Sequence, residues 1–493
     1  MNLWEKYNHS FHEFGSRTAF CIGGKTFSYS EFSAYISGSQ LLLLKKLNGA
    51  SGLPVGVMCH DSIETFAAIF AIWFSGCHFV PLHPLHPVMF NREKIQQAGL
   101  VYIFSSETIP EEYDPDVQPI LNKDITDKRP LLVLPEQNRA YILFTSGSTG
   151  FPKGVPISVK NLNAFIEGFQ DIYPDLTFED RFLQTYELTS DAAFTGYLIP
   201  LLLGATVFTI PGTSIKYLAI VKILQEYQIT WTQFTPSVLN YLRPYLKSLR
   251  FDHLKHSHFG GEALPFDLVN EWAQCVPNAE ISNIYGPTET TITCTILRTP
   301  ADRLSLHVHD KQISIGKPIK DVKILIIDDH SQVLPDGEKG ELCIGGPQVM
   351  KSYLQTKGKD PFLVVGNERY YRSGDMVFVD ENGFLMFCGR KDDQMKINGY
   401  RIEPVEIELA ISRAANGLKC RVFGFKKQSG MEAMVAFVEK YDGKTVELQE
   451  KLREFLAPAF IPEKIISISQ FPLNTNGKVD KLQLFHSYSS QMT

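Results

Sequence analysis

A run of hydroxyl groups and glycines at residues 145–154 is the segment whose composition most directly suggests chemistry. It follows a strand-like apolar run, Tyr141–Phe144, and it closes with a lysine. Glycines let backbone N–H groups converge on an anion, hydroxyl groups add donors, and a lysine adds positive charge. The spacing is not the GxxxxGK[ST] pattern, because Gly154 follows the lysine. The predicted phosphate-binding residues are Thr145, Ser146, Gly147, Ser148, Thr149, Gly150 and Lys153.

Five further blocks follow this loop along the chain. They are Phe259–Pro265 (FGGEALP), Asn283–Glu289 (NIYGPTE), Tyr371–Asp375 (YRSGD), Gly389–Glu403 (GRKDDQMKINGYRIE) and Pro472–Asp480 (PLNTNGKVD). In content and order, the six blocks resemble the motifs of the AMP-forming adenylating enzymes. That superfamily includes acyl-CoA synthetases, luciferases and the adenylation domains of nonribosomal peptide synthetases. The resemblance covers essentially the whole chain.

The resemblance implies a site for ATP, with a set of nucleotide contacts outside the loop. These would be Gly260, Gly261, Asn283, Tyr285, Asp375 and Arg390. An amide and an aromatic ring suit an adenine base, and a carboxylate such as Asp375 can accept both ribose hydroxyls. Thr288 would touch the α-phosphate. Glu289 would bind Mg²⁺, a cation that prefers hard oxygen ligands.

The resemblance also implies that the last block carries the residue most important for chemistry. A carboxylate that attacks the α-phosphorus brings two negative groups together, and a lysine between them stabilises the transition state and positions it. Lys478 occupies the position of that lysine. Asp392 resembles a hinge residue about which a small domain rotates after adenylation. Lys396, Gly399 and Tyr400 would then form the face that admits a phosphopantetheine arm.

Asp191 is the residue that bears on the substrate class. Amino-acid-activating members usually carry Phe-Asp-x-Ser here, and the aspartate pairs with the substrate α-ammonium. The match is partial, because Ser190 and Ala193 replace the Phe and the Ser. An N-cap of the following helix is the alternative role for Asp191. A fatty acyl substrate needs no buried anion, and an unpaired one is costly.

The remainder of the predicted substrate pocket is medium-sized and contains some polar groups. Its residues are Ala192, Thr195, Gln233, His258, Ile284, Ile292 and Thr293. Gln233 and His258 are either hydrogen-bonded core residues or readers of the substrate side chain. The chain is also similar in length to the stand-alone D-alanyl carrier protein ligases. These commonly carry Cys at the position of Gly260, so the identity of the amino acid stays open.

Only 15 residues follow Lys478, too few for a carrier domain. We therefore expect a phosphopantetheinylated carrier protein supplied in trans as the thiol acceptor. An acyl- or aryl-CoA ligase is the alternative, and in that enzyme Asp191 would be incidental. A catalytically silent nucleotide-binding scaffold is the third hypothesis, and the retained Lys153, Glu289, Asp375 and Lys478 argue against it.

The composition restricts partners and location. Of 493 residues, 48 are Lys or Arg and 54 are Asp or Glu, a formal net charge of −6, which disfavours a general nucleic-acid binder. Eight cysteines include no CxxC pair, so free thiols in a reducing cytoplasm are expected. The N-terminus lacks the apolar core of a signal peptide. The apolar run from Thr65 to Leu82 is interrupted by Gly76 and His78, which favours a buried helix and a strand over a membrane span.

Apolar segments of strand length alternate with segments of helical period through most of the chain. This pattern predicts an α/β fold with helices that cover sheets. From about Val322 onward, short strands joined by Pro-Asp-Gly and Glu-Asn-Gly turns predict a small antiparallel, barrel-like part. Amphipathic helices among strands predict a small, mobile α+β domain at the end. We expect a large domain at 1–391 and a small C-terminal domain at 392–493.

Overall fold

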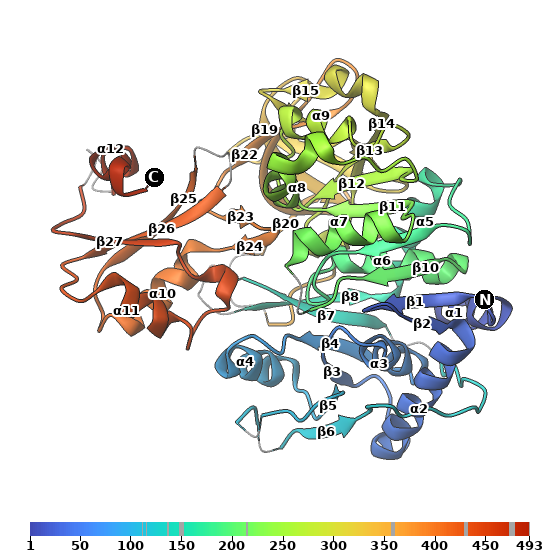
Figure 1. Ribbon diagram of the computed structural model, residues 1–493. Helices are drawn as coiled ribbons and strands as arrows, with labels where there is room; N and C mark the ends of the chain where they lie inside the picture. Colours follow the sequence, from blue (N-terminus) through green and yellow to red (C-terminus); the bar gives the residue numbers. More distant parts are fainter. Residues whose placement is uncertain are drawn as a thin grey trace.

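The structure is a computed structural model that describes residues 1–110, 112–114, 116–135, 138–146, 152–212, 215–355, 360–427, 432–472 and 479–492. Figure 1 shows a large body built from sheets covered by helices and, beside it, a smaller lobe formed by the C-terminal segment. The predicted α/β layering is confirmed, and so is the division into a large N-terminal and a small C-terminal domain.

A six-stranded sheet forms the first layer of the large domain. Its order is β6 (Gln118–Leu121), β5 (Tyr102–Ser105), β3 (Pro54–Met58), β4 (His78–Leu82), β7 (Arg139–Thr145) and β8 (Lys153–Ser158). Every neighbouring pair is parallel except β7 and β8, which run antiparallel and pair Thr145 with Lys153. Helices α1 (Leu3–Glu13), α2 (Tyr29–Leu47), α3 (Ile63–Phe74), α4 (Val88–Ala98) and α5 (Val159–Ile172) accompany it.

The predicted buried helix and strand within the 65–82 run are confirmed as α3 and β4. All 12 residues of α3 are buried, because aromatic side chains from α1 and α2 pack over it. The indole rings of Trp4 and Trp73, for example, stack with centroids 4.5 Å apart. Among the described residues, no helix combines the length and the apolar character that crossing a membrane requires. All eight cysteines are free thiols, as predicted.

A nine-stranded sheet forms the second layer and carries most of the candidate site. Its order is β17 (Lys317–Pro318), β14 (Thr295–Pro300), β13 (Glu280–Tyr285), β12 (His256–Gly260), β11 (Trp231–Phe234), β9 (Arg181–Gln184), β10 (Thr206–Thr209), β1 (Thr18–Ile22) and β2 (Lys25–Ser28). Strands β13, β12, β11, β9, β10 and β1 are parallel, so their carboxyl ends meet at one edge. Helices α6 (Ala192–Leu203), α7 (Lys216–Glu226), α8 (Pro236–Leu242) and α9 (Phe266–Ala273) lie between these strands in the chain.

The antiparallel part predicted from residue 322 is a five-stranded sheet. Its strands are β18 (Lys323–Ile327), β19 (Gly340–Gly345), β21 (Glu368–Val379), β20 (Phe362–Val365) and β22 (Leu385–Arg390). Strand β21 is longer than the Tyr370–Ser373 run that the sequence suggests. It continues past Gly374, which has a φ of +72°, because the register shifts on both neighbouring strands absorb the irregular backbone.

The described residues of the small C-terminal domain form a hairpin, a three-stranded sheet, three α-helices and a 3₁₀-helix at Pro458–Phe460. The hairpin pairs β23 (Met395–Ile397) with β24 (Tyr400–Ile402), and the sheet comprises β25 (Cys420–Lys426), β26 (Glu432–Glu439) and β27 (Lys464–Ile468). Helices α10 (Pro404–Ala414) and α11 (Thr445–Leu452) share one apolar cluster with the hairpin. Val479 and α12 (Lys481–Met492) belong to a second cluster. Alternate residues of β26 enter the two clusters, so these lie on opposite faces of the sheet.

Candidate functional site

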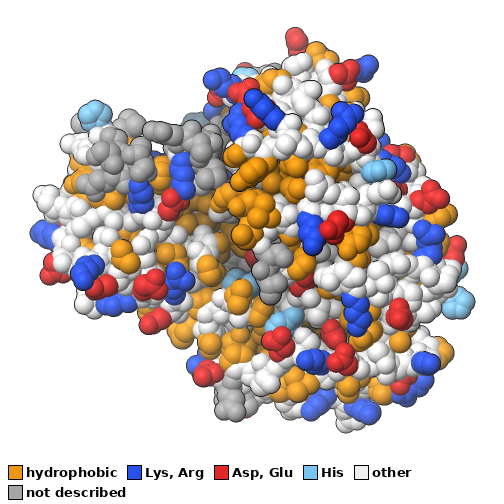
Figure 2. All heavy atoms as spheres, in the orientation of Figure 1, with side chains coloured by type: hydrophobic (Ala, Val, Ile, Leu, Met, Phe, Trp, Pro, Cys, Tyr) orange, Lys and Arg blue, Asp and Glu red, His pale blue; other side chains and the backbone are white. Residues whose placement is uncertain are grey.

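A cavity of about 180 Å³ lies where the small domain meets the large one. Its walls come from the ends of β7, β11, β12 and β13, from the start of α6, and from hairpin β23–β24. Ligands of open α/β sheets bind outside the carboxyl ends of parallel strands, and this cavity has that position. In the orientation of Figure 2, hydrophobic side chains gather along the hollow between the two domains.

Asp191 projects into this cavity with an incomplete set of partners. Its side chain is 9% exposed, and its Oδ2 has no hydrogen-bond partner among the described residues. It precedes α6 but makes no side-chain capping hydrogen bond, so the structure does not support the N-cap role. Burial raises the pKa of Asp191 to about 6, and the charge of Glu289 adds to this, while hydrogen bonding from Thr288 and from the backbone of Ala192 and Ile292 opposes it. The site therefore holds a carboxylate that a cation would stabilise.

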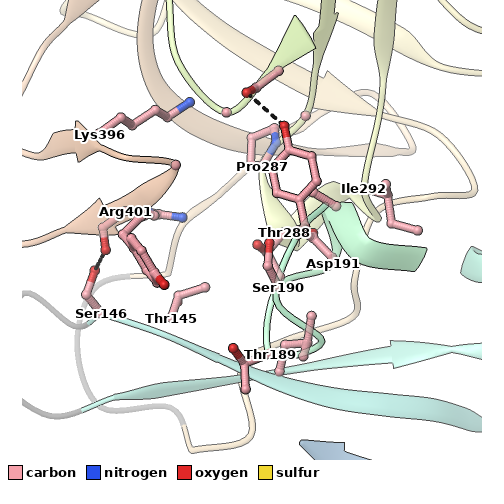
Figure 3. Close-up of a pocket in the computed structure, with 18 of the residues that line it drawn as sticks. Thr145, Ser146, Thr189, Ser190, Asp191, Pro287, Thr288, Ile292, Lys396 and Arg401 are labelled. Atoms are coloured by element: carbon pink, nitrogen blue, oxygen red, sulfur yellow. Dashed lines mark hydrogen bonds between the residues drawn. The ribbon is translucent and has the colours of Figure 1, made fainter. Parts of the chain in front are cut away.

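The structure brings most of the predicted pocket residues together. Those that line the cavity are Asp191, Ala192, Gln233, Ile284, Ile292 and Thr293. Thr195 and His258 do not line it and are completely buried. The ring of His258 packs against Trp231 and Tyr173, with centroids 4.6 and 5.0 Å away. Figure 3 shows Asp191, Thr288 and Ile292 on the wall opposite Lys396 and Arg401.

Gly260 and Gly261 line the same cavity at the end of β12. A Cβ at Gly260 would lie 2.6 Å from Cγ1 of Ile284, and Gly261 has a φ of +84°. The close packing of β12 on β13 and the left-handed backbone therefore both require glycine here.

A charged and aromatic group lies beside these glycines. The hydroxyl of Tyr285 donates to Oδ2 of Asp375 at 2.5 Å, and Arg390 donates to Oδ1 of the same carboxylate at 3.0 Å. Asn283 lies on β13 two residues before Tyr285 and lines a neighbouring cavity of about 460 Å³. Its Nδ2 donates to the carbonyl oxygen of Ser314 at 2.9 Å, which fixes the orientation of the amide. Four predicted nucleotide contacts thus surround one corner of the site.

The predicted phosphate loop is described only at its two ends. Thr145 and Lys153 pair across β7 and β8, and Ser146 follows directly, so the strands anchor the loop at the cavity. The ammonium group of Lys153 lies 5.8 Å from the ring centroid of Tyr353. Gly147, Ser148, Thr149, Gly150 and the proposed catalytic Lys478 lie outside the described residues.

Hairpin β23–β24 holds the predicted thiolation residues inside the cavity. The backbone N–H of Gly399 donates to Oε1 of Glu262 at 2.8 Å, and the hydroxyl of Tyr400 donates to Glu187. The ammonium of Lys396 lies 5.5 Å from the ring centroid of Tyr285, and burial lowers the pKa of this lysine. The small domain is thus docked through side chains of the large one.

Arg401 is not among the predicted site residues, yet it pairs with Glu289, the predicted Mg²⁺ ligand. One guanidinium nitrogen of Arg401 lies 2.9 and 3.0 Å from the two carboxylate oxygens of Glu289, and Tyr353 donates to the same carboxylate at 2.8 Å. The backbone carbonyl oxygen of Arg401 accepts a hydrogen bond from the hydroxyl of Ser146 at 2.8 Å, as Figure 3 shows. Although burial opposes ionisation, Arg401 holds the pKa of Glu289 below its usual value. The position of Arg401 within the Gly389–Glu403 block, next to the predicted thiolation residues, is the sequence signal that could have identified it.

The outer part of the cavity carries a second feature that the sequence did not reveal. Lys94 on α4 is 3% exposed, and its ammonium group lies 4.7 Å from the ring centroid of Phe90. Burial lowers the pKa of Lys94 to about 8 and raises that of Glu406 on α10 to about 8, and the opposite charges partly offset both shifts. Because α4 and α10 belong to different domains, each domain contributes one of these two opposite charges.

A model of the AMP-binding enzyme family matches residues 7–354. The chain belongs to this family. Its expected identity as an enzyme of the AMP-forming ligase class is thereby confirmed. The matched residues include the phosphate loop, the start of α6, β11, β12 and the segment from Asn283 to Glu289.

Known members of the AMP-binding family resemble this chain over nearly its full length. The delta-poly-L-ornithine synthetase of Acinetobacter baumannii is 30% identical over 505 residues, which is 98% of this chain and 36% of that protein. The chain spans between 10% and 36% of the length of the first curated relatives that it matches.

Solved structures share the fold over both domains. The adenylation domain AlmE of Vibrio cholerae, in complex with glycyl-adenosine-5'-phosphate, has a TM-score of 0.86 at 24% identity and covers 99% of this chain and 98% of its own. Holo-PA1221, an NRPS protein that contains adenylation and PCP domains, has a TM-score of 0.82 at 24% identity. That match covers 98% of this chain and 84% of PA1221.

Proposed function

We propose that this AMP-binding enzyme activates an amino acid as its aminoacyl-AMP and transfers the aminoacyl group to the phosphopantetheine thiol of a carrier protein. The observation that carries this proposal is Asp191, a buried carboxylate with an unpartnered oxygen in the cavity of an AMP-binding enzyme. A substrate α-ammonium would satisfy that oxygen and pair with its charge. A fatty or aryl acid would leave the carboxylate buried without a partner, which is costly.

The nucleotide roles follow the geometry of the corner around Tyr285. We assign adenine to the region of Asn283, Tyr285, Gly260 and Gly261, and the ribose hydroxyls to Asp375, whose carboxylate Arg390 and Tyr285 hold in place. Thr288, Thr145, Ser146, Lys153 and the residues 147–150 would hold the phosphates.

Glu289 fits a Mg²⁺ site on one condition. Within the described residues, no cluster of three or more His, Cys, Asp or Glu side chains could hold a metal ion. Mg²⁺ in nucleotide sites usually takes one or two carboxylates together with phosphate oxygens and waters, so a single glutamate is sufficient. In the present arrangement, however, Arg401 occupies both oxygens of Glu289. Glu289 can therefore bind the ion only when Arg401 has withdrawn.

Two arrangements of the small domain account for the two half-reactions. The hairpin with Lys396, Gly399 and Tyr400 packs on one face of the small sheet. Val479, the residue after Lys478, packs on the other. Because the hairpin belongs to the cluster on one face and Val479 to the cluster on the other, we infer that adenylation by Lys478 and thiol transfer past the hairpin use different orientations of the small domain. We place its hinge at Asp392, which separates β22 from β23, and hence the domain boundary at 391/392.

ATP–pyrophosphate exchange with matched amino and des-amino acids tests the first half of the proposal. We expect exchange with at least one amino acid and little with its des-amino counterpart. A preference for des-amino acids would favour the CoA ligase instead, and no exchange with any acid would favour the silent scaffold. The second half is tested by the acceptor. Aminoacyl transfer to a phosphopantetheinylated carrier protein should exceed transfer to free CoA.

A further inference from the structure

The polar atoms at one end of the cavity lack hydrogen-bond partners. Gln233 is 2% exposed, and neither its Oε1 nor its Nε2 has hydrogen-bond geometry with a described residue; the hydroxyl of Tyr186, which donates to the carbonyl oxygen of Gly260, is the neighbouring polar group that can reach this amide. Oγ1 of Thr195 and Nε2 of His258, both in fully buried side chains, likewise have no hydrogen-bond partner among the described residues. Buried polar groups are almost always hydrogen-bonded, because an unsatisfied one keeps the full cost of its desolvation. Gln233 lines the cavity, whereas Thr195 and His258 do not, so the two amide atoms of Gln233 indicate a place where a ligand group can form hydrogen bonds.

The three residues lie on neighbouring elements. Gln233 and His258 are paired in register on the parallel strands β11 and β12, so their side chains leave the same face of the sheet. Helix α6, which carries Thr195, lies over the adjacent strand β9. There a Cβ on Gly196 would lie 3.0 Å from Cγ of Gln184. Of the three, Gln233 lines the cavity, so it is the residue that a ligand reaches.

The protonation state of His258 sets the polarity of this end of the cavity. Its Nδ1 lies 3.2 Å from the carbonyl oxygen of Thr232, which can only accept, so Nδ1 carries the proton. Burial lowers the pKa of His258 well below its usual value, with a smaller contribution from His256, and the ring is therefore neutral. Nε2 is then a buried acceptor without a donor. A neutral ring also offers no charge to balance an acidic ligand.

The neutral amide of Gln233 offers no counter-ion to a charged substrate side chain, although Lys94 and Lys396 line the same cavity. The charge of Asp191 is taken by the α-ammonium under the proposed function, and the carboxamide of Gln233 is itself neutral. The aliphatic walls at Ala192, Ile284 and Ile292 exclude water without adding polar atoms. An unpaired charge in such surroundings is disfavoured far more than a neutral polar group that is hydrogen-bonded.

The geometry points to a substrate amino acid with a neutral, hydrogen-bonding side chain, a carboxamide or a hydroxyl, which Gln233 recognises. This inference rests on the proposed function and specifies its substrate. A carboxamide fits best, because it can donate to Oε1 and accept from Nε2 of Gln233 at the same time.

Isosteric pairs of amino acids test the inference in the exchange assay. Asparagine is compared with leucine, glutamine with methionine and threonine with valine, each as both enantiomers, together with aspartate and lysine. We expect at least one polar member to exceed its apolar isostere by roughly tenfold or more in kcat/KM, since a site built around hydrogen bonds rejects analogues that lack them. Aspartate and lysine should be poorer than that polar member.

The variant Gln233→Met removes both polar atoms at nearly constant length. It should bring the polar and apolar members of the preferred pair to within about threefold of one another. The same substitution at Gln449, whose amide lies in the small domain and donates to the carbonyl oxygen of Pro462, should leave the ranking unchanged. The wild-type panel decides the question even if Gln233→Met does not fold.

Different failures have different meanings. An apolar or charged amino acid that equals or exceeds its polar partners in the wild type overturns this inference and leaves amino acid adenylation intact. Exchange with no amino acid at all overturns the proposed function, and this inference with it.

Discussion

The two walls of the cavity differ in how their polar groups are satisfied. On the large-domain wall, Asp191 and Gln233 present buried atoms that have no hydrogen-bond partner within the described part of the chain. On the hairpin wall, Gly399, Tyr400 and Arg401 bond to Glu262, Glu187 and Glu289 of the large domain. The first wall is organised for a ligand, whereas the second uses the protein itself as its partner. Rotation of the small domain would break these three contacts, and under the proposed function Mg²⁺ would replace Arg401 at Glu289.

The largest expected effect concerns the arrangement that the hairpin contacts exclude. Lys478→Ala should reduce pyrophosphate exchange by about three powers of ten, because the variant lacks the charge that stabilises the transition state. Aminoacyl transfer from supplied aminoacyl-AMP should be largely unchanged, because the hairpin arrangement does not use this lysine. Exchange at near wild-type rates would show that the wrong residue has been assigned.

The next effect tests the ligand-facing wall. Asp191→Ala leaves the substrate cation buried without its partner, at a cost of about 3–5 kcal/mol, or about two to nearly four powers of ten in kcat/KM for the amino acid. The KM for ATP should change little. Asp191→Asn, which keeps the shape, should show a similar loss, and both variants should discriminate less against des-amino acids. Unchanged discrimination would mean that Asp191 does not contact the ammonium.

Arg401→Met tests the protein-facing wall. Without the guanidinium, the buried charge of Glu289 loses its cationic partner in the arrangement with the hairpin docked. The equilibrium between the two orientations of the small domain therefore shifts away from the docked hairpin. Transfer from preformed aminoacyl-AMP to the carrier should slow by about tenfold or more, while exchange stays within about threefold of wild type. Arg421→Met is the control, because Arg421 pairs with Glu408 inside the small domain. Equal losses in both half-reactions would argue against a selective role.

The pH dependence of kcat/KM for the amino acid distinguishes the ionisation of Asp191 on one wall from that of Glu289, which bonds to the other. Asp191 binds the ammonium only as a carboxylate, and its pKa in the free protein is raised to about 6. Activity should therefore fall as the pH decreases through 6, by about tenfold between pH 7 and pH 5. Glu289, whose pKa is lowered, should still be ionised there. The inflection near pH 6 should be absent when Asp191→Asn is assayed with a des-amino acid.

The smallest effect concerns the hinge. Asp392→Pro fixes φ near −65° and should slow thiol transfer severalfold while adenylation persists, because one arrangement is then favoured. Asp392→Ala, which removes the carboxylate that pairs with Arg390 without restricting φ, is the control. If the alanine variant is equally slow, the ion pair rather than the backbone conformation controls the rotation.

The sequence by itself determined the family, the layered fold and the identity of most residues around the cavity. Motif residues such as Tyr285 and Asp375 are recognised by local spacing, and the helical and strand periods of α3 and β4 follow from adjacent residues. Strand β21 was predicted too short, because a bulge depends on the neighbouring strands rather than on its own residues.

Only the tertiary structure decided which polar groups are satisfied. Asp191 was weighed as a helix cap and Gln233 as a core residue, and neither alternative can be judged without the positions of their neighbours. The Arg401–Glu289 pair joins residues 112 positions apart in the chain. Hydrogen bonding and burial depend on contacts between distant segments, which local sequence does not encode. The hydrogen bonding and burial of these side chains distinguish the wall that can bind a ligand from the wall whose side chains are already bonded to the other domain.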